Sequence, residues 1–284
     1  MQNILDRPEQ VLSIMRDVAA DEILPRFNKL NAADISEKKP GDLVTIADKA
    51  SEEALRKRLS ALLPGSVLIG EEDFESNPKS LQRVAEEAPV WIVDPVDGTH
   101  NFAHGKSPFT VIVALLKGGE TQAGWIIDPL AGDALWAMRG SGAWQQDASG
   151  SVTQVTRPVK AFTDSTMTAG HKLQRRLIRA ADELSSALPN LVERYRCVGR
   201  EYMDIAQGTL DLARYSGILK PWDHAAGCLI VREGGGQADN VKTAEPYRAS
   251  PSLGTHSIGI VGNSAHWPAF LNLIERADAL VDQN

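Results

Sequence analysis

The chain has 284 residues, 43% hydrophobic and 24% charged, which is ordinary for a globular protein and enough for one large domain or two closely packed halves. Its formal net charge of -7 excludes the basic surface that non-specific nucleic-acid binding needs, so we expect no nucleic-acid partner. No run approaches the roughly 18 consecutive apolar residues of a membrane span, so we expect no membrane association.

Two further features indicate a cytoplasmic protein. Residues 1–7 lack the basic start and the apolar core of a signal peptide. The two cysteines, Cys197 and Cys228, are too few for a disulfide scaffold, and we expect both to be reduced, buried thiols.

The first half of the chain alternates between helical and strand patterns. Apolar residues at a period near 3.6 predict a helix over residues 11–27, and a second helix that stops at the Pro-Gly pair 64–65. The polar segment 36–41 between them holds a Pro-Gly pair and is predicted to be a loop. Apolar runs predict strands at 67–69, 90–93, 109–116, 122–127 and 134–138.

The second half alternates in a similar way. We expect strands at 166–169, 192–198 and 258–261, and helices at 173–184, up to 207, from Asp223 to 234–236 and from about 264. The cationic side chains near the helix 173–184, including Lys172 and Arg175, are interpreted as a solvated face. The segment 145–164 is the expected boundary, which divides the chain into an N-terminal half, 1–150, and a C-terminal half, 151–284. The interleaved pattern predicts layers of helix and sheet.

Acidic residues stand at three places where predicted strands end or helices begin. Glu71 and Glu72 follow the strand 67–69, Asp94 and Asp97 follow the strand 90–93, and Asp223 opens a helix. Each place alone has an ordinary interpretation as a solvated turn or a helix N-cap. Together they predict a crevice lined by carboxylates, which are ligands that suit Mg²⁺ or Mn²⁺.

The segment 94–99, of sequence DPVDGT, combines cation and anion ligands. Asp94 and Asp97 can face the same site, and the carbonyl group of Val96 is available between them. The backbone N–H groups of Gly98 and Thr99 would form an anion site if a helix begins there. Cation ligands beside phosphate donors are the pattern expected for metal-assisted phosphoryl chemistry.

Several motifs together resemble the inositol monophosphatase family. They occur in the family's order over residues 38–262: DLVTIAD at 42–48, GEE at 70–72, WIVDPVDGT at 91–99 followed by Asn101 and Phe102, WDHAAG at 222–227 and EGGG at 233–236. The resemblance implies an alternating αβαβα sandwich, of the type shared with fructose-1,6-bisphosphatase, a homodimer, lithium sensitivity in many members and dependence on two to three Mg²⁺ ions.

The resemblance also implies roles for individual residues. A first Mg²⁺ would be held by Glu71, Asp94 and the Val96 carbonyl, a second by Asp94, Asp97 and Asp223, and a third, more weakly, by Glu72. Asp48 and Thr99 would form a hydrogen-bonded pair beside the nucleophilic water, which Thr99 or Glu71 would orient or deprotonate. The substrate contacts would be Asp97, Gly98, Thr99, His100, Arg196 and Asp223.

The sequence departs from the family near the substrate. Residues 214–221 hold no acid where inositol-specific members usually have a glutamate, and Arg196 and Arg200 stand where small residues are usual. Two arginines would favour a more anionic substrate, unless they pair with local acids such as Glu201. His100 would contact the leaving group or cap a turn.

The sequence therefore predicts a metal-dependent phosphomonoesterase acting on a small phosphorylated metabolite. Alternatives within the family are a 3′(2′),5′-bisphosphate nucleotidase, a fructose-1,6-bisphosphatase and a histidinol-phosphatase. An alternative of another class is a regulatory protein that binds the transcription machinery.

Overall fold

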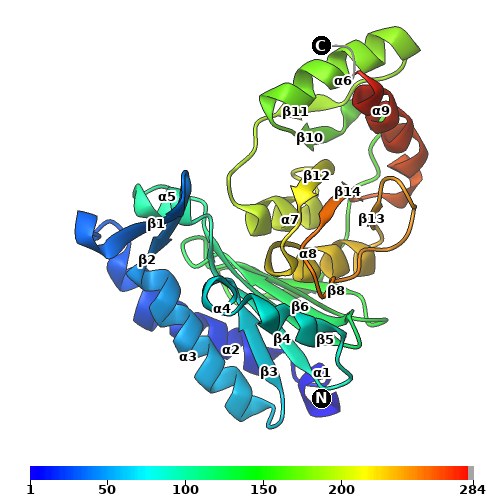
Figure 1. Cartoon of the computed structure of the whole chain (residues 1–284). Helices are drawn as coiled ribbons and strands as arrows, with labels where there is room; N and C mark the ends of the chain where they lie inside the picture. The colour runs from blue at the N-terminus through cyan, green and yellow to red at the C-terminus, as the bar shows by residue number, and fades with distance from the viewer. Residues whose placement is uncertain (281–284) are drawn as a thin grey trace.

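The computed structural model describes residues 1–280 and stacks them in alternating layers of helix and sheet (Figure 1). An outer layer of helices covers a seven-stranded sheet, a middle helical layer separates it from a five-stranded sheet, and a last pair of helices covers the outside. The predicted layered α/β fold is confirmed. The helices of these three layers are α2 (Glu9–Val18) and α3 (Ile46–Leu62), then α7 (Val198–Gln207) and α8 (Pro221–Glu233), then α6 (His171–Leu184) and α9 (Trp267–Ala279).

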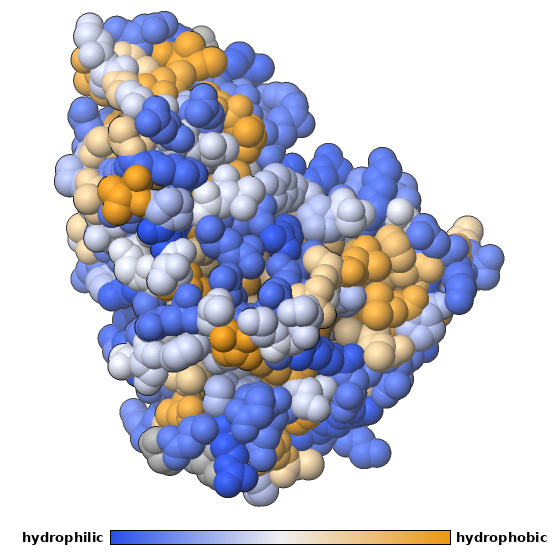
Figure 2. Space-filling view, turned by 180° about the vertical axis from the view of Figure 1, so that it is seen from behind, coloured by the Kyte–Doolittle hydropathy of each residue, from blue (hydrophilic) through white to orange (hydrophobic). Residues whose placement is uncertain are grey.

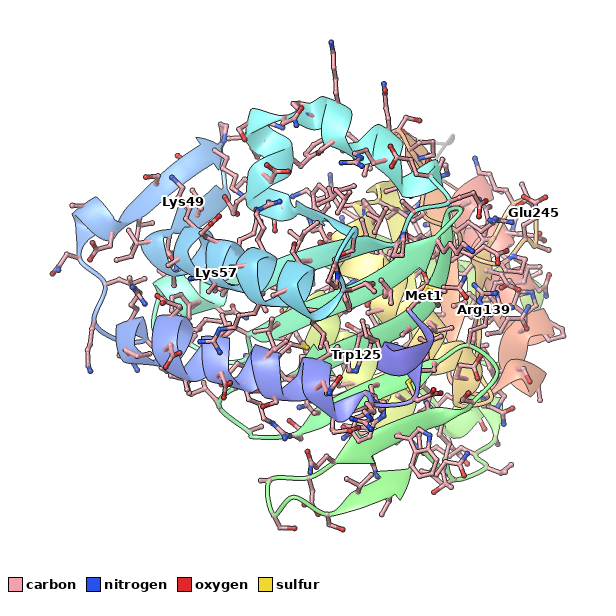
Figure 3. The ribbon with its side chains drawn as sticks, turned by 90° about the horizontal axis from the view of Figure 1, so that it is seen from below. Met1, Lys49, Lys57, Trp125, Arg139 and Glu245 are labelled. Carbon is pink, nitrogen blue, oxygen red and sulfur yellow. The ribbon has the colours of Figure 1, made fainter. Side chains whose placement is uncertain are left out.

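The larger sheet runs in the order β3-β4-β5-β6-β7-β8-β9. Only β3 and β4 pair in parallel, and the remaining pairs are antiparallel. Seen from below, α2 and α3 lie side by side across this sheet, with Lys49 and Lys57 on the exposed face of α3 (Figure 3). Its strands are β3 (Val67–Gly70), β4 (Val90–Asp97), β5 (Thr110–Lys117), β6 (Glu120–Ile127), β7 (Ala134–Met138), β8 (Ala143–Gln146) and β9 (Val152–Gln154).

The smaller sheet runs in the order β11-β10-β12-β14-β13. The strand β10 is parallel to both of its neighbours, whereas β14 is antiparallel to β12 and β13. Its strands are β10 (Thr166–Thr168), β11 (Asn190–Val192), β12 (Leu212–Ile218), β13 (Gln237–Asn240) and β14 (Thr255–Val261).

The strand β5 shows why both faces of the larger sheet are covered. It is apolar at every position from 111 to 116, so its alternate side chains cannot face water on either side. Val111, Val113 and Leu115 pack in the core under α2 and α3, and Ile112 and Ala114 pack in the core under α7 and α8.

Close approach of the middle helices depends on glycine. A Cβ atom at Gly227 of α8 would lie 2.2 Å from Cγ of Tyr202 on α7, and one at Gly124 of β6 would lie 2.6 Å from Cα of Ala226. Glycine at these positions lets α8 lie against both α7 and the sheet, which brings the start of α8 to the end of β4.

Two expectations about local structure were wrong, and a third was right in its extent but not in its regularity. The segment 36–41 is not a loop, because β1 (Ile35–Lys39) and β2 (Asp42–Thr45) pair as an antiparallel hairpin that turns at Pro40 and Gly41. The strand predicted at 192–198 lies earlier in the chain, because β11 covers Asn190–Val192 and Val198 already begins α7. The predicted helix 11–27 is regular only to Val18 and then loosens into a π-helical turn. Strand pairing and helix packing decided these segments, and neither is visible in a local pattern.

The prediction for the two cysteines is confirmed. Both cysteines are free and buried. No helix within residues 1–280 combines the length and the apolar character that crossing a bilayer requires. The division between residues 150 and 151 stays a prediction, although the chain does change from the larger sheet to the smaller one between β9 and β10.

Candidate active site

Most of the predicted site residues line one pocket of about 190 Å³. It gathers five carboxylates from four elements: Asp42 at the start of β2, Glu71 at the start of α4 (Glu71–Ser76), Asp94 and Asp97 at the end of β4, and Asp223 in the first turn of α8. The strand β4 continues through Asp97, so the acids lie at the end of a buried strand rather than on a free turn. The same pocket is lined by Val96, Gly98, Thr99, His100 and Arg196.

Asp48 does not line this pocket but is bonded to a residue that does. The hydroxyl oxygen of Thr99 lies 3.0 Å from Oδ1 of Asp48 and 2.9 Å from the carbonyl oxygen of Val96. The other carboxylate oxygen of Asp48 accepts hydrogen bonds from the backbone and hydroxyl of Thr45, which caps α3. Burial raises the pKa of Asp48 to about 6, although the bonds from Thr45 and Thr99 act in the opposite direction.

Two lysines that the sequence analysis did not assign lie against the glutamates of α4. Nζ of Lys220 is 2.8 Å from Oε1 of Glu71, and Nζ of Lys38 is 2.5 Å from Oε1 of Glu72. Burial raises the pKa of Glu71, but the charges of Lys220 and Lys38 outweigh it and the pKa is lowered. Glu72 lies outside the pocket that holds Asp94, and burial raises its pKa to about 7.

Among the described residues, Asp94 and Asp223 form no ion pair like those of Glu71 and Glu72 with the lysines. Burial raises the pKa of each well above its ordinary value, and the neighbouring charge of Glu71 raises it further. The backbone N–H group of Val96 donates to Oδ1 of Asp94 at 3.1 Å. A buried concentration of like charge is the condition that a divalent cation relieves.

The donor set fits a hard divalent ion by type and by charge, since it consists of carboxylates and the Val96 carbonyl. As they stand, no three His, Cys, Asp or Glu side chains among the described residues lie close enough together to hold a metal ion. Ammonium groups of Lys220 and Lys38 lie beside Glu71 and Glu72 instead. An incoming cation would therefore compete with these lysines for the glutamates.

Asp97 is tied to the start of α7. Its Oδ2 atom accepts hydrogen bonds from the backbone of Gly199 at 2.6 Å and from the hydroxyl of Thr110 at 2.9 Å, and Cys197 lies 3.1 Å away. Its Oδ1 atom accepts from the backbone of Val198. Asp97 thus fixes the position of α7 relative to β4, in addition to any role in the pocket.

Glu52 is a site residue that the sequence analysis missed. It lies on α3, is 4% exposed, and accepts hydrogen bonds from the backbone N–H groups of Glu72 at 2.8 Å and Asp73 at 2.9 Å. It therefore caps the helix that carries Glu71 and Glu72. The available signal was its spacing, because Glu52 lies four residues after Asp48 and thus on the same face of the helix.

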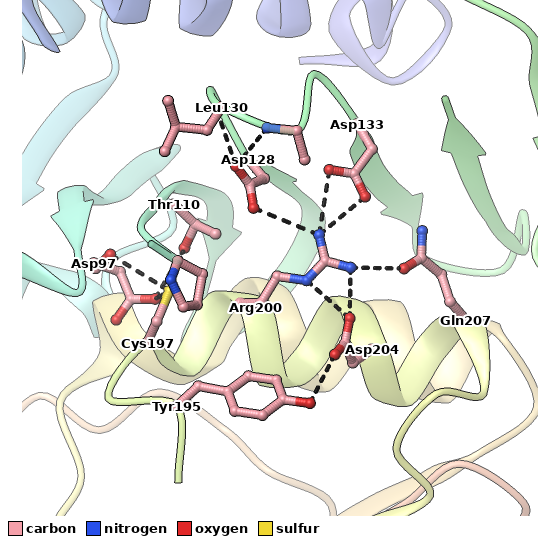
Figure 4. A network of polar contacts seen from close by, with 12 residues as sticks. Asp97, Thr110, Asp128, Leu130, Asp133, Tyr195, Cys197, Arg200, Asp204 and Gln207 are labelled. Carbon is pink, nitrogen blue, oxygen red and sulfur yellow. Dashed lines mark hydrogen bonds and ion pairs between the residues drawn. The ribbon is translucent and has the colours of Figure 1, made fainter. Parts of the chain in front are cut away.

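The two arginines of the segment 196–200 have different surroundings. Arg196 lines the pocket and lies 3.2 Å from Nε2 of His100, whose ring stacks on His104. Arg200 points away from the pocket and bonds to carboxylates, as the ordinary interpretation expected, but these are Asp133 and Asp204 rather than Glu201 (Figure 4).

His224 lies behind the site rather than in the pocket around Asp94. It is 3% exposed, and its Nδ1 atom lies 3.1 Å from the hydroxyl oxygen of Tyr202. Burial, helped by the charge of Arg194, lowers the pKa of His224 to about 3, so this imidazole is neutral at physiological pH.

The chain is similar to known proteins in sequence and in fold. The sequence profile of the Inositol monophosphatase family matches residues 8–275. The chain belongs to the inositol monophosphatase family. It is 30% identical over 233 residues to the inositol-1-monophosphatase of Bacillus subtilis, which covers 79% of this chain and 80% of that protein.

Two other matches extend the comparison within the inositol monophosphatase family. The chain is 32% identical over 222 residues to a protein of Pasteurella multocida called Nus factor SuhB, which covers 76% of this chain and 78% of the relative. The structure of an IMPase from Thermotoga maritima superposes with a TM-score of 0.75 over 98% of this chain and 99% of the other, at 19% identity, which establishes the shared fold.

Proposed function

We propose that this chain is a Mg²⁺-dependent phosphomonoesterase that hydrolyses a small phosphorylated metabolite. The observation that carries the proposal is the gathering of Glu71, Asp94, Asp97 and Asp223 in one pocket with Thr99. Membership of the inositol monophosphatase family supports the same reaction class.

The residues divide into two groups by their expected role. Glu71, Asp94 and the Val96 carbonyl would hold one Mg²⁺, Asp94, Asp97 and Asp223 a second, and Glu72 a weaker third. When bound, such ions lower the pKa of a water molecule and stabilise the negative charge of a leaving oxygen. Mn²⁺ prefers the same oxygen ligands and is expected to substitute.

The protein's own groups position the water and take its proton. The hydroxyl of Thr99 donates to Asp48 and accepts a hydrogen bond from the attacking water, so the pair can pass a proton from water to Asp48. The pKa of Asp48, about 6, lies close enough to neutral pH for a proton acceptor. Glu71, ionised because Lys220 and Lys38 lower its pKa, orients the same water.

The remaining pocket residues would hold the substrate. The backbone N–H groups of Gly98 and Thr99 would bind the phosphate, and Asp223 would lie near the departing oxygen. Arg196 and His100 line the pocket and are the expected contacts for the rest of the molecule.

A phosphate-release assay tests this proposal. Purified protein is incubated with inositol 1-phosphate, fructose 1,6-bisphosphate, adenosine 3′,5′-bisphosphate and histidinol phosphate, with Mg²⁺ or with a chelator. We expect Mg²⁺-dependent release from at least one substrate, and a loss of at least about 100-fold for Asp94→Asn. The exposed Asp182 of α6 supplies the control Asp182→Asn, which should keep full activity. Normal turnover by Asp94→Asn would contradict the metal assignment.

A second candidate function rests on a specific relative. The Pasteurella multocida protein at 32% identity is called a Nus factor, which favours a regulatory role in transcription. Recovery of RNA polymerase on immobilised protein, together with a phosphatase-dead Asp94→Asn variant that still complements a deletion, would favour this role. Homodimer formation, lithium sensitivity and a cytoplasmic location remain predictions.

A further inference from the structure

A second pocket adjoins the candidate active site. It has a volume of about 840 Å³ and is lined by the first turns of α6, the segment before α7 and the strand β12. Arg196 and Asp223 line both this pocket and the pocket that holds Asp94. A molecule whose phosphate is bound beside Asp94 could therefore extend into the second pocket. Seen from behind, the outline of the molecule is stepped, and hydrophilic residues cover most of this face (Figure 2).

The second pocket is rich in cationic side chains, some of which are already neutralised. Nη1 of Arg194 lies 2.6 Å from Oε2 of the buried Glu201. Arg214 and Arg176 both pair with Asp278, at 2.8 and 3.5 Å. His171 lies 3.2 Å from Glu193, with both side chains exposed. These groups form the walls, and apart from the two arginines that share Asp278 they are paired one to one.

Three other cations at this pocket have no such partner. Within residues 1–280, no carboxylate lies within 4.0 Å of the charged groups of Lys172, Arg175 or Arg196. Lys172 and Arg175 are three residues apart on α6 and so project from one face of the helix. Arg196 approaches from the segment before α7, where it makes its hydrogen bond to His100. The pocket therefore carries an excess of positive charge in a protein whose net charge is -7.

We propose that this pocket binds a second phosphate group of the substrate, so that the preferred substrate is a bisphosphorylated small molecule. The inference rests on the proposed phosphomonoesterase activity and specifies its substrate class. Guanidinium groups bind phosphate oxygens through paired hydrogen bonds, which an uncharged hydroxyl cannot match. The positive end of the α6 dipole adds to the same attraction. The cationic side chains that the sequence pattern assigned to a solvated face thus acquire a role.

The reaction remains a simple hydrolysis. Water adds to the phosphorus of the phosphate beside Asp94, the ester P–O bond breaks, and the alcohol oxygen takes a proton. Inorganic phosphate leaves, and the second phosphate stays on the product unchanged. A substrate with a cationic tail, such as an amino-alcohol phosphate, would be repelled by Lys172, Arg175 and Arg196.

Matched substrate pairs test the proposal. Values of kcat/KM are measured for adenosine 3′,5′-bisphosphate against adenosine 3′-monophosphate, and for fructose 1,6-bisphosphate against fructose 1-phosphate. The wild-type protein should prefer one of the bisphosphates to its monophosphate. The ratio of kcat/KM for the bisphosphate to kcat/KM for the monophosphate should fall about 10-fold in Arg175→Gln. It should fall about 100-fold in Lys172→Gln/Arg175→Gln, because each charged hydrogen bond that is lost costs about a factor of 10. Arg179→Gln removes the same charge from an exposed position of α6 outside the pocket and should leave the ratio unchanged.

The outcomes separate the two proposals. If the wild-type protein hydrolyses a monophosphate as well as its bisphosphate, or if Arg175→Gln and Arg179→Gln change the ratio equally, the second phosphate site is rejected while the phosphomonoesterase activity stands. If the wild-type protein releases phosphate from none of these substrates with Mg²⁺, the proposed function itself fails.

Discussion

The carboxylate of Glu52 accepts a hydrogen bond from the backbone N–H group of Glu72 at 2.8 Å, which joins α3 to the first turn of α4. The second oxygen of the same carboxylate accepts from Asp73 at 2.9 Å. Burial raises the pKa of Glu52, whereas these two backbone bonds lower it. A Cβ atom at residue 70 would lie 2.1 Å from this carboxylate, so Gly70 is required for the contact. The position of Glu71 in the pocket thus depends on a residue that does not line the pocket.

The first prediction concerns this cap. Glu52→Ala should raise the Mg²⁺ concentration for half-maximal activity about 10- to 100-fold, because the helix that carries Glu71 and Glu72 loses its N-terminal cap. Glu52→Gln keeps one acceptor and should have a smaller effect. The control is Glu53→Gln on the same helix, since Glu53 is exposed. Metal titration of phosphate release measures the effect, and an unchanged Mg²⁺ requirement in Glu52→Ala would refute the positioning role.

The second prediction concerns Lys220. Its ammonium group lies 2.8 Å from Glu71, so Lys220→Met leaves Glu71 and the other carboxylates of the pocket without this neutralising charge. We expect the melting temperature of the protein in chelator to fall by a few degrees, and the rise on addition of Mg²⁺ to be larger than in the wild type. Lys49→Met, on the exposed face of α3, is the control. Equal Mg²⁺-induced shifts in Lys220→Met and the wild type would contradict the competition between lysine and metal.

The third prediction is a pH dependence. Burial lowers the pKa of His224 to about 3 from its ordinary value of 6.5, so below pH 6.5 the unfolded chain takes up a proton that the folded protein does not. The contribution of neutral His224 to stability is therefore complete above pH 6.5 and is lost as the pH falls toward 3. Between pH 7 and pH 5 this loss amounts to about 2 kcal/mol of the free energy of unfolding.

The variant His224→Asn isolates this contribution. Urea denaturation is measured at pH 7 and pH 5 for both proteins, and the decrease should be about 2 kcal/mol smaller in the variant. The comparison uses the change with pH, so any constant loss of packing in the variant cancels. Parallel decreases in the two proteins would mean that His224 is protonated in the folded state.

The fourth prediction concerns the packing of α8. Gly227→Ala should lower the free energy of unfolding by about 1–3 kcal/mol, because the added methyl group would lie 2.2 Å from the ring of Tyr202. Gly170→Ala is the matched control, since a Cβ atom there has no neighbour within 4 Å among the described residues. Chemical denaturation measures both variants. Similar stability of the two would show that α7 and α8 move apart freely.

The amino-acid sequence by itself predicted which carboxylates gather in the candidate active site. The acids 71, 94, 97 and 223 follow apolar strands or open a helix, and such positions are held rigidly by the buried elements next to them. The layered fold was also predictable, because the alternation of helical and strand periods leaves few other ways to bury both faces of β5.

The tertiary structure decided what surrounds that centre. Glu52, Lys38 and Lys220 reach Glu71 and Glu72 from elements remote in sequence, so no local pattern could assign them. The same applies to the two arginines, of which Arg200 is neutralised by Asp133 and Asp204 while Arg196 lines both pockets. Motif spacing predicted which carboxylates meet in one pocket. Which charged side chains remain unpaired and can meet a substrate depends on ion pairs between distant segments. Only the folded chain brings those segments together.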